Sequence, residues 1–158
     1  MTTKNIIFDL GNVLFDYDYI DLRQAHTFPE INPFKPISHG FDILKNCLNQ
    51  LDANGDRAYK IYVLSNWSKV SYSLLERHHP ETLNLFDGIV TSGEVGVKKP
   101  DRRIYEHLLA KYSLNPEDCI FIDDQIENIE MAERLGITGI LCNEFSRVEY
   151  HLKRLKIY

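Results

Sequence analysis

The sequence predicts a three-layer α/β fold in which a five-stranded parallel sheet lies between two layers of helices. Short apolar segments alternate with segments whose apolar residues recur at helical spacing, as a parallel sheet with crossover helices requires. The apolar segments are nearly continuous, which is typical of strands covered on both faces. A length of 158 residues suits one domain. We therefore expect a single domain over residues 1–158.

The five expected strands are short, apolar and bounded by polar residues or glycine. They lie at residues 5–10, 60–64, 88–91, 119–122 and 139–141. Because consecutive strands are separated by helical patterns, right-handed crossovers would make them parallel.

The first expected helix follows the apolar spacing of Phe41, Leu44, Leu48 and Leu51 and stops at the Asn54-Gly55 pair. Further helices are expected at residues 68–77, from Pro100-Asp101 onward, at 126–135 and at 145–155. Ser68 or Asn66 would cap the second helix, because their side chains accept hydrogen bonds from free backbone amides. Gly136 would end the helix at 126–135.

The interval from residue 15 to residue 40 is expected to be irregular. Pro29, Pro33 and Pro36 exclude a long helix there. About 55 residues separate Asp9 from Ser65, and the helix that begins near Phe41 and the strand after it use nearly half of them. The remainder has room for a flap and a loop, but not for a four-helix insertion.

Composition and charge exclude several classes of protein. The formal net charge of −5 gives no reason to expect nucleic acid or an anionic membrane as a partner. No apolar run approaches the roughly 20 residues of a membrane span, and residues 1–5 show no signal-peptide pattern. Cys47, Cys119 and Cys142 are odd in number and lack paired spacing, which fits reduced thiols acting as small apolar side chains. We therefore expect a cytoplasmic location.

The first expected strand carries an acidic residue at its carboxyl end. The run Ile6-Ile7-Phe8-Asp9-Leu10-Gly11 delivers Asp9 to a glycine-bearing turn. A charge at the end of a buried strand is costly unless it is used, and α/β sheets bind ligands at this edge. Three later segments carry polar groups at comparable places: Val63-Leu64-Ser65-Asn66, Gly96-Val97-Lys98-Lys99-Pro100, and Phe121-Ile122-Asp123-Asp124 followed by Asn128.

In this order, the four segments resemble the four motifs of the haloacid dehalogenase-like (HAD) hydrolase superfamily. The resemblance runs from residue 5 to about residue 142, and the ordered set is far more specific than any single motif. It implies a Rossmann-like HAD core with phosphatase chemistry. Relatives often insert a helical cap between the first two motifs. The short interval here implies no cap or a minimal one, with residues 15–40 as flap and loop.

The resemblance implies that Asp9 is a nucleophile that forms an aspartyl-phosphate. A carboxylate is ionised at pH 7 and needs no separate activating base. Because phosphate and carboxylate are both anionic, a divalent cation is expected, and hard oxygen ligands suit Mg²⁺. The implied ligands are Asp9, the Gly11 carbonyl and Asp124, with Asp123 bound directly or through water. On its own, the acidic pair could equally be a helix N-cap.

The remaining motif residues would bind the phosphoryl group or support the site. The Ser65 hydroxyl and the Asn66 backbone amide would donate to phosphoryl oxygens, although a Ser-Asn pair can also simply cap a helix. Lys99 would neutralise charge on Asp9 and on the phosphoryl group. Asn128 lies one helical turn after Asp124, where it could hold Lys99 or the metal shell, or be a plain surface residue.

Gly11 departs from the pattern of related phosphatases. They usually carry a second aspartate there, which protonates the leaving group. Its loss matters less for a good leaving group, such as an anomeric sugar oxygen or an acyl phosphate. Asp16 and Asp18 could supply the proton or be solvated flap residues. A dehalogenase also lacks the second aspartate, but the retained acidic pair favours Mg²⁺ and phosphate.

Two other features have competing interpretations. His78-His79 could suggest metal binding, but no partner stands at ligand spacing, so a polar helix end is the better interpretation. Trp67 lies two residues after Ser65, where it could contact a substrate ring or be buried in the core.

The sequence thus predicts Mg²⁺-dependent hydrolysis of a phosphate monoester. A small-molecule ester is expected, while a bulky or protein phosphate, and an oligomer in which another subunit forms the roof, stay open. The alternative is a catalytically weak relative that binds a phosphorylated ligand or a protein partner without turnover.

Overall fold

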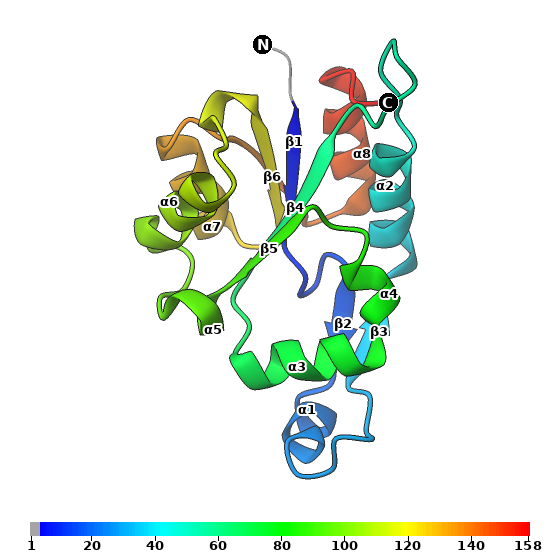
Figure 1. The fold of residues 1–158 in the computed structure, drawn as a ribbon, viewed down its shortest axis with the longest axis vertical. Coiled ribbons are helices and arrows are strands. Elements are labelled where there is room, and N and C mark those ends of the chain that lie inside the picture. Colours follow the sequence, from blue (N-terminus) through cyan, green and yellow to red (C-terminus); the bar gives the residue numbers. More distant parts are fainter. Residues whose placement is uncertain (1–3) are drawn as a thin grey trace.

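The computed structural model describes residues 4–158 and contains the predicted five-stranded parallel sheet (Figure 1). The strand order is β5-β4-β1-β6-β7, so β1 is central. The strands are β1 (Asn5–Phe8), β4 (Lys60–Ser65), β5 (Gly88–Thr91), β6 (Cys119–Asp123) and β7 (Thr138–Leu141). Residues 1–3, part of the segment on which the absence of a signal peptide was argued, lie outside the described residues.

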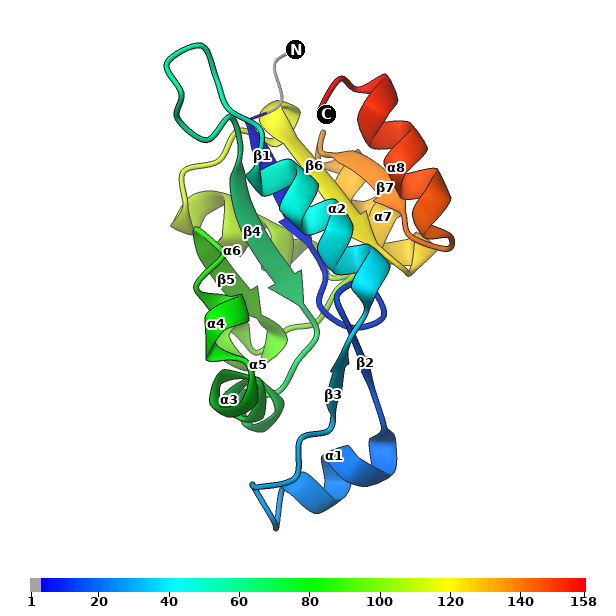
Figure 2. The same ribbon diagram turned by 90° about the vertical axis from the view of Figure 1, so that its right-hand side faces the viewer.

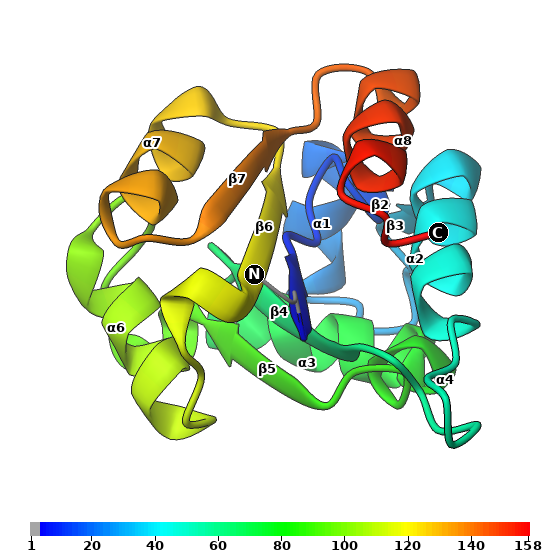
Figure 3. The ribbon, with the colours of Figure 1, turned by 90° about the horizontal axis from the view of Figure 1, so that it is seen from above.

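Helices cover both faces of the sheet, which confirms the three-layer arrangement (Figure 3). One face carries α2 (Ser38–Leu48) and α8 (Phe145–Arg154), and the other carries α6 (Arg102–Lys111) and α7 (Ile126–Arg134). Successive side chains of a strand point to opposite faces. Ile6 and Phe8 therefore pack in one core and Ile7 in the other. This double burial explains why the strands are continuously apolar.

Several element boundaries differ from the prediction. α2 ends at Leu48, and Leu51 is exposed in a bridge with Arg57. β1 ends at Phe8 because the backbone then folds into a tight loop, in which the amides of Leu14 and Phe15 both donate to the Leu10 carbonyl. Local apolar spacing does not distinguish this loop from the strand, since its apolar residues Leu10, Val13 and Leu14 are as buried as those of β1.

The remaining helices are short or lie near the predicted positions. α3 (Lys69–His78) is capped by Ser68, whose hydroxyl accepts from the Ser71 amide, and not by Asn66. The Asp101 side chain caps α6, and Gly136 follows α7 with φ of +87°. The sequence analysis did not identify α4 (Pro80–Leu83), α5 (Ser92–Val95) or the 3₁₀ turn at Pro116–Asp118.

The interval after β1 forms a small antiparallel hairpin with one helix at its tip (Figure 2). It consists of β2 (Phe15–Tyr17), α1 (Tyr19–Ala25) and β3 (Phe34–Pro36), and we call residues 15–36 the flap. The flap extends beyond the carboxyl ends of the parallel strands, on the side where Asp9 lies. No helix or strand was predicted here, although the Asp18 side chain is a recognisable cap for α1.

Two histidines attach the flap to the body of the protein. His78 Nε2 donates to the Pro29 carbonyl at 3.0 Å, and Asn32 Nδ2 donates to His79 Nε2 at 3.1 Å. Both contacts are hydrogen bonds within the chain at the end of α3, as expected for a polar helix end.

All three cysteines are buried and unpaired, as expected for small apolar side chains. Within residues 4–158, no helix combines the length and apolar character that crossing a membrane requires.

Candidate active site

Asp9 follows β1 directly and is held by three donors on one of its carboxylate oxygens. Its Oδ1 accepts from the Leu10 amide at 2.8 Å and from Ser65 Oγ at 2.6 Å, and it pairs with Lys99 Nζ at 3.1 Å. Among the described residues, none donates to Oδ2. The carboxylate is therefore fixed in orientation while one oxygen is left available.

Lys99 is buried and its ammonium group contacts three acceptors. Nζ donates to the Leu64 carbonyl at 2.8 Å and to Asp123 Oδ2 at 2.6 Å, in addition to its ion pair with Asp9. Its side chain is only 1% exposed. A buried ammonium is costly unless it is paired and hydrogen-bonded, so these contacts fix its position between the two carboxylates.

Asn66 positions the segment that carries Lys99. Its Oδ1 accepts from the Lys99 amide at 2.7 Å, and its Nδ2 donates to the Lys99 carbonyl at 3.0 Å. The expectation from sequence was a possible helix cap for the Asn66 side chain and a phosphate contact for its backbone amide, so this role of the side chain was missed. A residue that bonds both backbone groups of another loop cannot be identified from local spacing.

Asp123 is fully buried and both of its oxygens are occupied by protein donors. Oδ1 accepts from the Gln125 amide at 2.8 Å, Oδ2 accepts from Lys99, and Asn128 Nδ2 lies within 3.1 Å of both. Asn128 is buried and holds Asp123, not Lys99 itself. The geometry favours an indirect role for Asp123, because no oxygen is left for a direct bond to a metal.

Asp124 is partly exposed and makes a hydrogen bond that the sequence analysis did not foresee. Its Oδ2 accepts from Asn12 Nδ2 at 3.0 Å, across 112 positions of sequence. Asn12 has φ of 57°, a left-handed conformation that Asn tolerates better than most residues. The Asn after Gly11 was the available signal.

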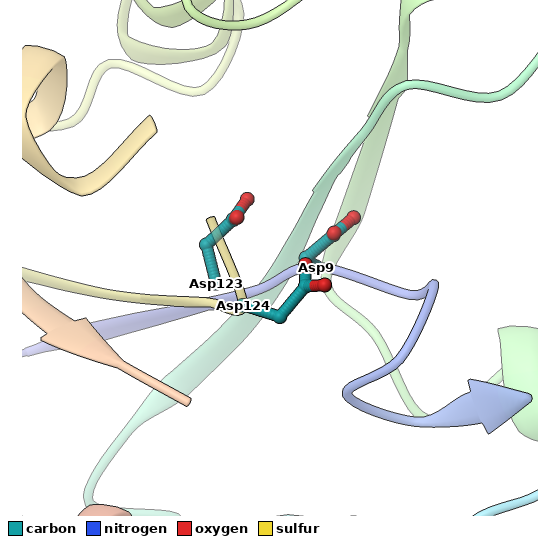
Figure 4. A group of neighbouring side chains, drawn as sticks. All are labelled: Asp9, Asp123 and Asp124. Atoms are coloured by element: carbon teal, nitrogen blue, oxygen red, sulfur yellow. The ribbon is translucent and has the colours of Figure 1, made fainter. Parts of the chain in front are cut away.

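The three carboxylates form a group that could hold a metal ion (Figure 4). One ligand atom from each of Asp9, Asp123 and Asp124 lies within 4.8 Å of the others. Three carboxylates and one lysine leave an uncompensated charge of about −2, which a divalent cation would neutralise. Among the described residues, Asp124 Oδ1 and the Gly11 carbonyl receive no hydrogen bond. Hard oxygen donors of this kind suit Mg²⁺.

Burial dominates the electrostatics of Asp9 in the metal-free protein. It raises the pKa of Asp9 from 3.8 to about 6, against the lowering effect of Lys99 and with a smaller raising effect from Asp123. A bound cation would favour the ionised form instead.

Gly11 is packed against two aromatic rings. A Cβ at this position would lie 3.3 Å from Tyr17 Cε1 and 3.5 Å from Trp67 Nε1. Trp67 is buried and stacks on Phe34, with ring centroids 4.9 Å apart. The ring therefore belongs to the core, as one of the two interpretations expected, and it also lies close to Gly11, while contact with a substrate stays a prediction.

The two candidate proton donors of the flap are engaged elsewhere. Asp16 is exposed and its side chain accepts from the Tyr17 amide, while Asp18 is exposed and caps α1. Burial, the Tyr19 hydroxyl and the charges of the nearby carboxylates raise the pKa of Tyr17, so this phenol stays protonated.

The fold places a group of carboxylates beside a buried lysine at one edge of the sheet, and comparison with known proteins identifies the family. The model of the haloacid dehalogenase-like hydrolase family matches residues 37–136. The chain belongs to this family, which confirms the resemblance of the four motifs.

Two curated relatives match over most of the chain. A sesquiterpene phosphatase of Aspergillus oryzae is 35% identical over 88% of this chain and 89% of the relative. Drimenol cyclase of Aspergillus calidoustus is 32% identical over 83% of this chain. The matched region is only 24% of the cyclase, so the chain spans about a quarter of that protein.

A solved structure with the same fold is a HAD family enzyme of Bacteroides thetaiotaomicron in complex with magnesium and inorganic phosphate. Its TM-score is 0.71 at 18% identity, covering 92% of this chain and 98% of the other. At this identity the likeness shows the fold alone.

Proposed function

We propose that this protein is a Mg²⁺-dependent phosphatase that hydrolyses phosphate monoesters through an aspartyl-phosphate at Asp9. The observation that carries the proposal is the asymmetry of the Asp9 carboxylate. Ser65, Lys99 and a backbone amide hold Oδ1, while Oδ2 receives no hydrogen bond from the described residues. A nucleophile needs this combination of fixed orientation and a free lone pair.

In the first step, Asp9 Oδ2 forms a bond to phosphorus and the bond to the ester oxygen breaks. The leaving group takes the electron pair and then a proton from water. In the second step, water attacks the acyl phosphate, which releases inorganic phosphate and restores the carboxylate. Lys99 stabilises the negative charge that spreads over the phosphoryl oxygens.

Ser65 and Asn66 would assist at the phosphoryl group. The Ser65 hydroxyl donates to Asp9 at 2.6 Å and can turn to a phosphoryl oxygen once Asp9 is esterified. The Asn66 backbone amide is a second donor, and its side chain keeps Lys99 in place.

Asp9, Asp124 and the Gly11 carbonyl would hold Mg²⁺, with Asp123 acting through Lys99 or a water molecule. When bound, the cation supplies charge neutralisation between the carboxylate and the phosphate. Asn128 would act as a positioning residue for Asp123, and Asn12 as one for Asp124.

The catalytic residues identify the phosphate end of the substrate but not its leaving group. Gly11 offers no carboxyl acid, and Asp16 and Asp18 are exposed flap residues with one oxygen each bonded to local backbone amides, so good leaving groups are favoured. Sugar 1-phosphates and acyl phosphates meet this requirement, and the sesquiterpene phosphatase relative adds an isoprenoid phosphate as a candidate. We propose a small-molecule ester. A protein phosphate would need the flap to be open, and a second subunit as roof would appear as an oligomer in light scattering.

The test is phosphate release from p-nitrophenyl phosphate, acetyl phosphate and a sugar 1-phosphate, each with Mg²⁺ and with EDTA. We expect turnover that needs Mg²⁺, favours good leaving groups and disappears in Asp9→Asn. Equal residual release by the wild type and Asp9→Asn would contradict the enzyme proposal. Phosphate binding by folded protein without any release would support the alternative, a protein that binds a phosphorylated ligand without turnover.

A further inference from the structure

A hollow of about 480 Å³ lies between the flap, the beginning of α3 and the loop before α6. This volume is within the range of about 300–1,000 Å³ that small-molecule pockets span. Figures 1 and 2 show the flap and α3 beyond the same edge of the sheet. Five apolar or aromatic side chains line the hollow: Tyr17, Tyr19, Leu22, Phe34 and Trp67.

The polar side chains of the lining are already hydrogen-bonded within the protein. Ser68 Oγ pairs with Ser71 Oγ at 2.9 Å, and Ser92 Oγ donates to the Trp67 carbonyl. Both ends of the Asn66 amide bond the Lys99 backbone. A ligand rich in hydroxyl groups would lose its hydrogen bonds to water and gain few new ones here. A hydrocarbon has no hydrogen bonds to replace.

The lining carries little charge. Among the described residues that border the hollow, Lys98 alone is charged, and its side chain is exposed. The two tyrosine hydroxyls lie 3.4 Å apart and can satisfy one another. Aromatic rings favour flat or unsaturated hydrocarbon groups through stacking.

The hollow adjoins the catalytic loop at Gly11. The missing side chain of Gly11 faces Tyr17 Cε1 and Trp67 Nε1, two of the lining rings, at 3.3 and 3.5 Å from an added Cβ. A larger residue at position 11 would lie between the rings and the nucleophile's loop. Glycine at this position thus lets two rings that line the hollow pack close to the loop that follows Asp9.

We infer that this hollow binds the leaving group of the substrate, and that this group is an apolar, π-rich hydrocarbon, either aryl or prenyl. The inference rests on the proposed function, since it assumes that the phosphate end of the same molecule lies at Asp9. It distinguishes between the candidate leaving groups, which the catalytic residues alone do not.

The test uses non-hydrolysable phosphonates with Mg²⁺, so that binding is measured without turnover. Calorimetry gives the dissociation constants of methylphosphonate, benzylphosphonate, a prenyl phosphonate and a phosphonate analogue of a sugar 1-phosphate. We expect the benzyl or the prenyl compound to bind at least about tenfold more tightly than methylphosphonate, from buried apolar area. Comparing the affinities of the benzyl and prenyl phosphonates shows whether the hollow prefers an aryl or a prenyl group. Trp67 is the sole tryptophan, so its fluorescence should change with these ligands only.

A matched pair of variants on α1 locates the binding site. Leu22→Ser places a hydroxyl in the hollow and should weaken the apolar phosphonate about tenfold while leaving methylphosphonate unchanged. Ile20→Ser is the control, because Ile20 is on the same helix but borders a different hollow with Phe28. If Leu22→Ser does not fold, the wild-type ligand series still decides.

The outcomes separate this inference from the proposed function. Tight apolar binding without any phosphate release would overturn the phosphatase proposal, and the hollow would then be a binding site for an apolar ligand and not for a leaving group. Phosphate release in the turnover assay, combined with tighter binding of the sugar phosphonate or with equal effects of the two variants on binding, would overturn the inference and leave the phosphatase proposal standing. Equal affinity for all four phosphonates would also overturn the inference.

Discussion

Replacing the proposed nucleophile should make the metal-free protein more stable, and the gain should depend on pH. Asp9→Asn keeps the shape of the protonated carboxyl group and removes its titration. In the wild type, burial raises the pKa of Asp9 from 3.8 to about 6. At about 1.36 kcal/mol for each pH unit, ionising this carboxylate costs roughly 3 kcal/mol of stability at pH 7.

The sign follows from proton binding. Between about pH 4 and pH 6, the folded protein binds more protons at Asp9 than the unfolded chain does. Stability therefore falls as the pH rises through this window, and the loss is complete above it. The variant should lack this slope. Its advantage should be close to zero near pH 4 and reach up to about 3 kcal/mol at pH 7.5.

The assay is urea denaturation of the wild type and Asp9→Asn in EDTA at pH 4, 5, 6 and 7.5. Asp42→Asn is the control: Asp42 is exposed on α2 and forms no side-chain hydrogen bond or ion pair with the described residues. It should follow the wild-type curve. If Asp9→Asn were less stable than the wild type at pH 7.5, or if the difference did not change with pH, the assignment of a desolvated carboxylate would be wrong.

Three further predictions concern the metal, the support of the site and the close approach of α3 and α5. Mg²⁺ at 100 times its dissociation constant should stabilise the wild type by about 2.7 kcal/mol in urea denaturation but not Asp9→Asn, and chelation should abolish turnover. Asn128→Ala removes the donor to both Asp123 oxygens, so unfolding free energy should fall by about 1–3 kcal/mol; an unchanged value would refute this. Gly93→Ala places a Cβ 2.5 Å from the Lys69 backbone nitrogen, so urea denaturation should show a loss of about 1–3 kcal/mol. A neutral result would mean that α5 moves away from α3 without cost.

Hydrophobic pattern and motif order were sufficient to predict the architecture. Every strand of the parallel sheet lies within two residues of its predicted bounds, and the four motifs identified the family. Strands buried on both faces have an unambiguous local signal, since Ile6, Ile7 and Phe8 are all apolar although they enter two different cores. Helix ends were less certain: Leu51 continues the apolar spacing of α2 and is nevertheless exposed.

The site was predictable where residues follow strand ends and unpredictable where they meet through space. Parallel strands end at one edge, so Asp9, Asp123 and Asp124 could be grouped from sequence, and the structure brings them together. The hydrogen bond from Asn12 to Asp124 could not be predicted, nor could those between the Asn66 side chain and the Lys99 backbone. Both join segments distant in sequence, and local spacing carries no information about them.

The sequence by itself determined the layers, the family and the set of charged groups at one edge of the sheet. Only the tertiary structure decided what each group contacts: Ser65 donates to Asp9, Asn128 holds Asp123, and Tyr17 of the flap packs against Gly11. The physical reason is the range of the interactions. Burial on a strand or helix follows from the pattern of neighbours a few residues away. A hydrogen bond or ring contact in the site joins residues far apart in sequence, which meet only when the chain is folded.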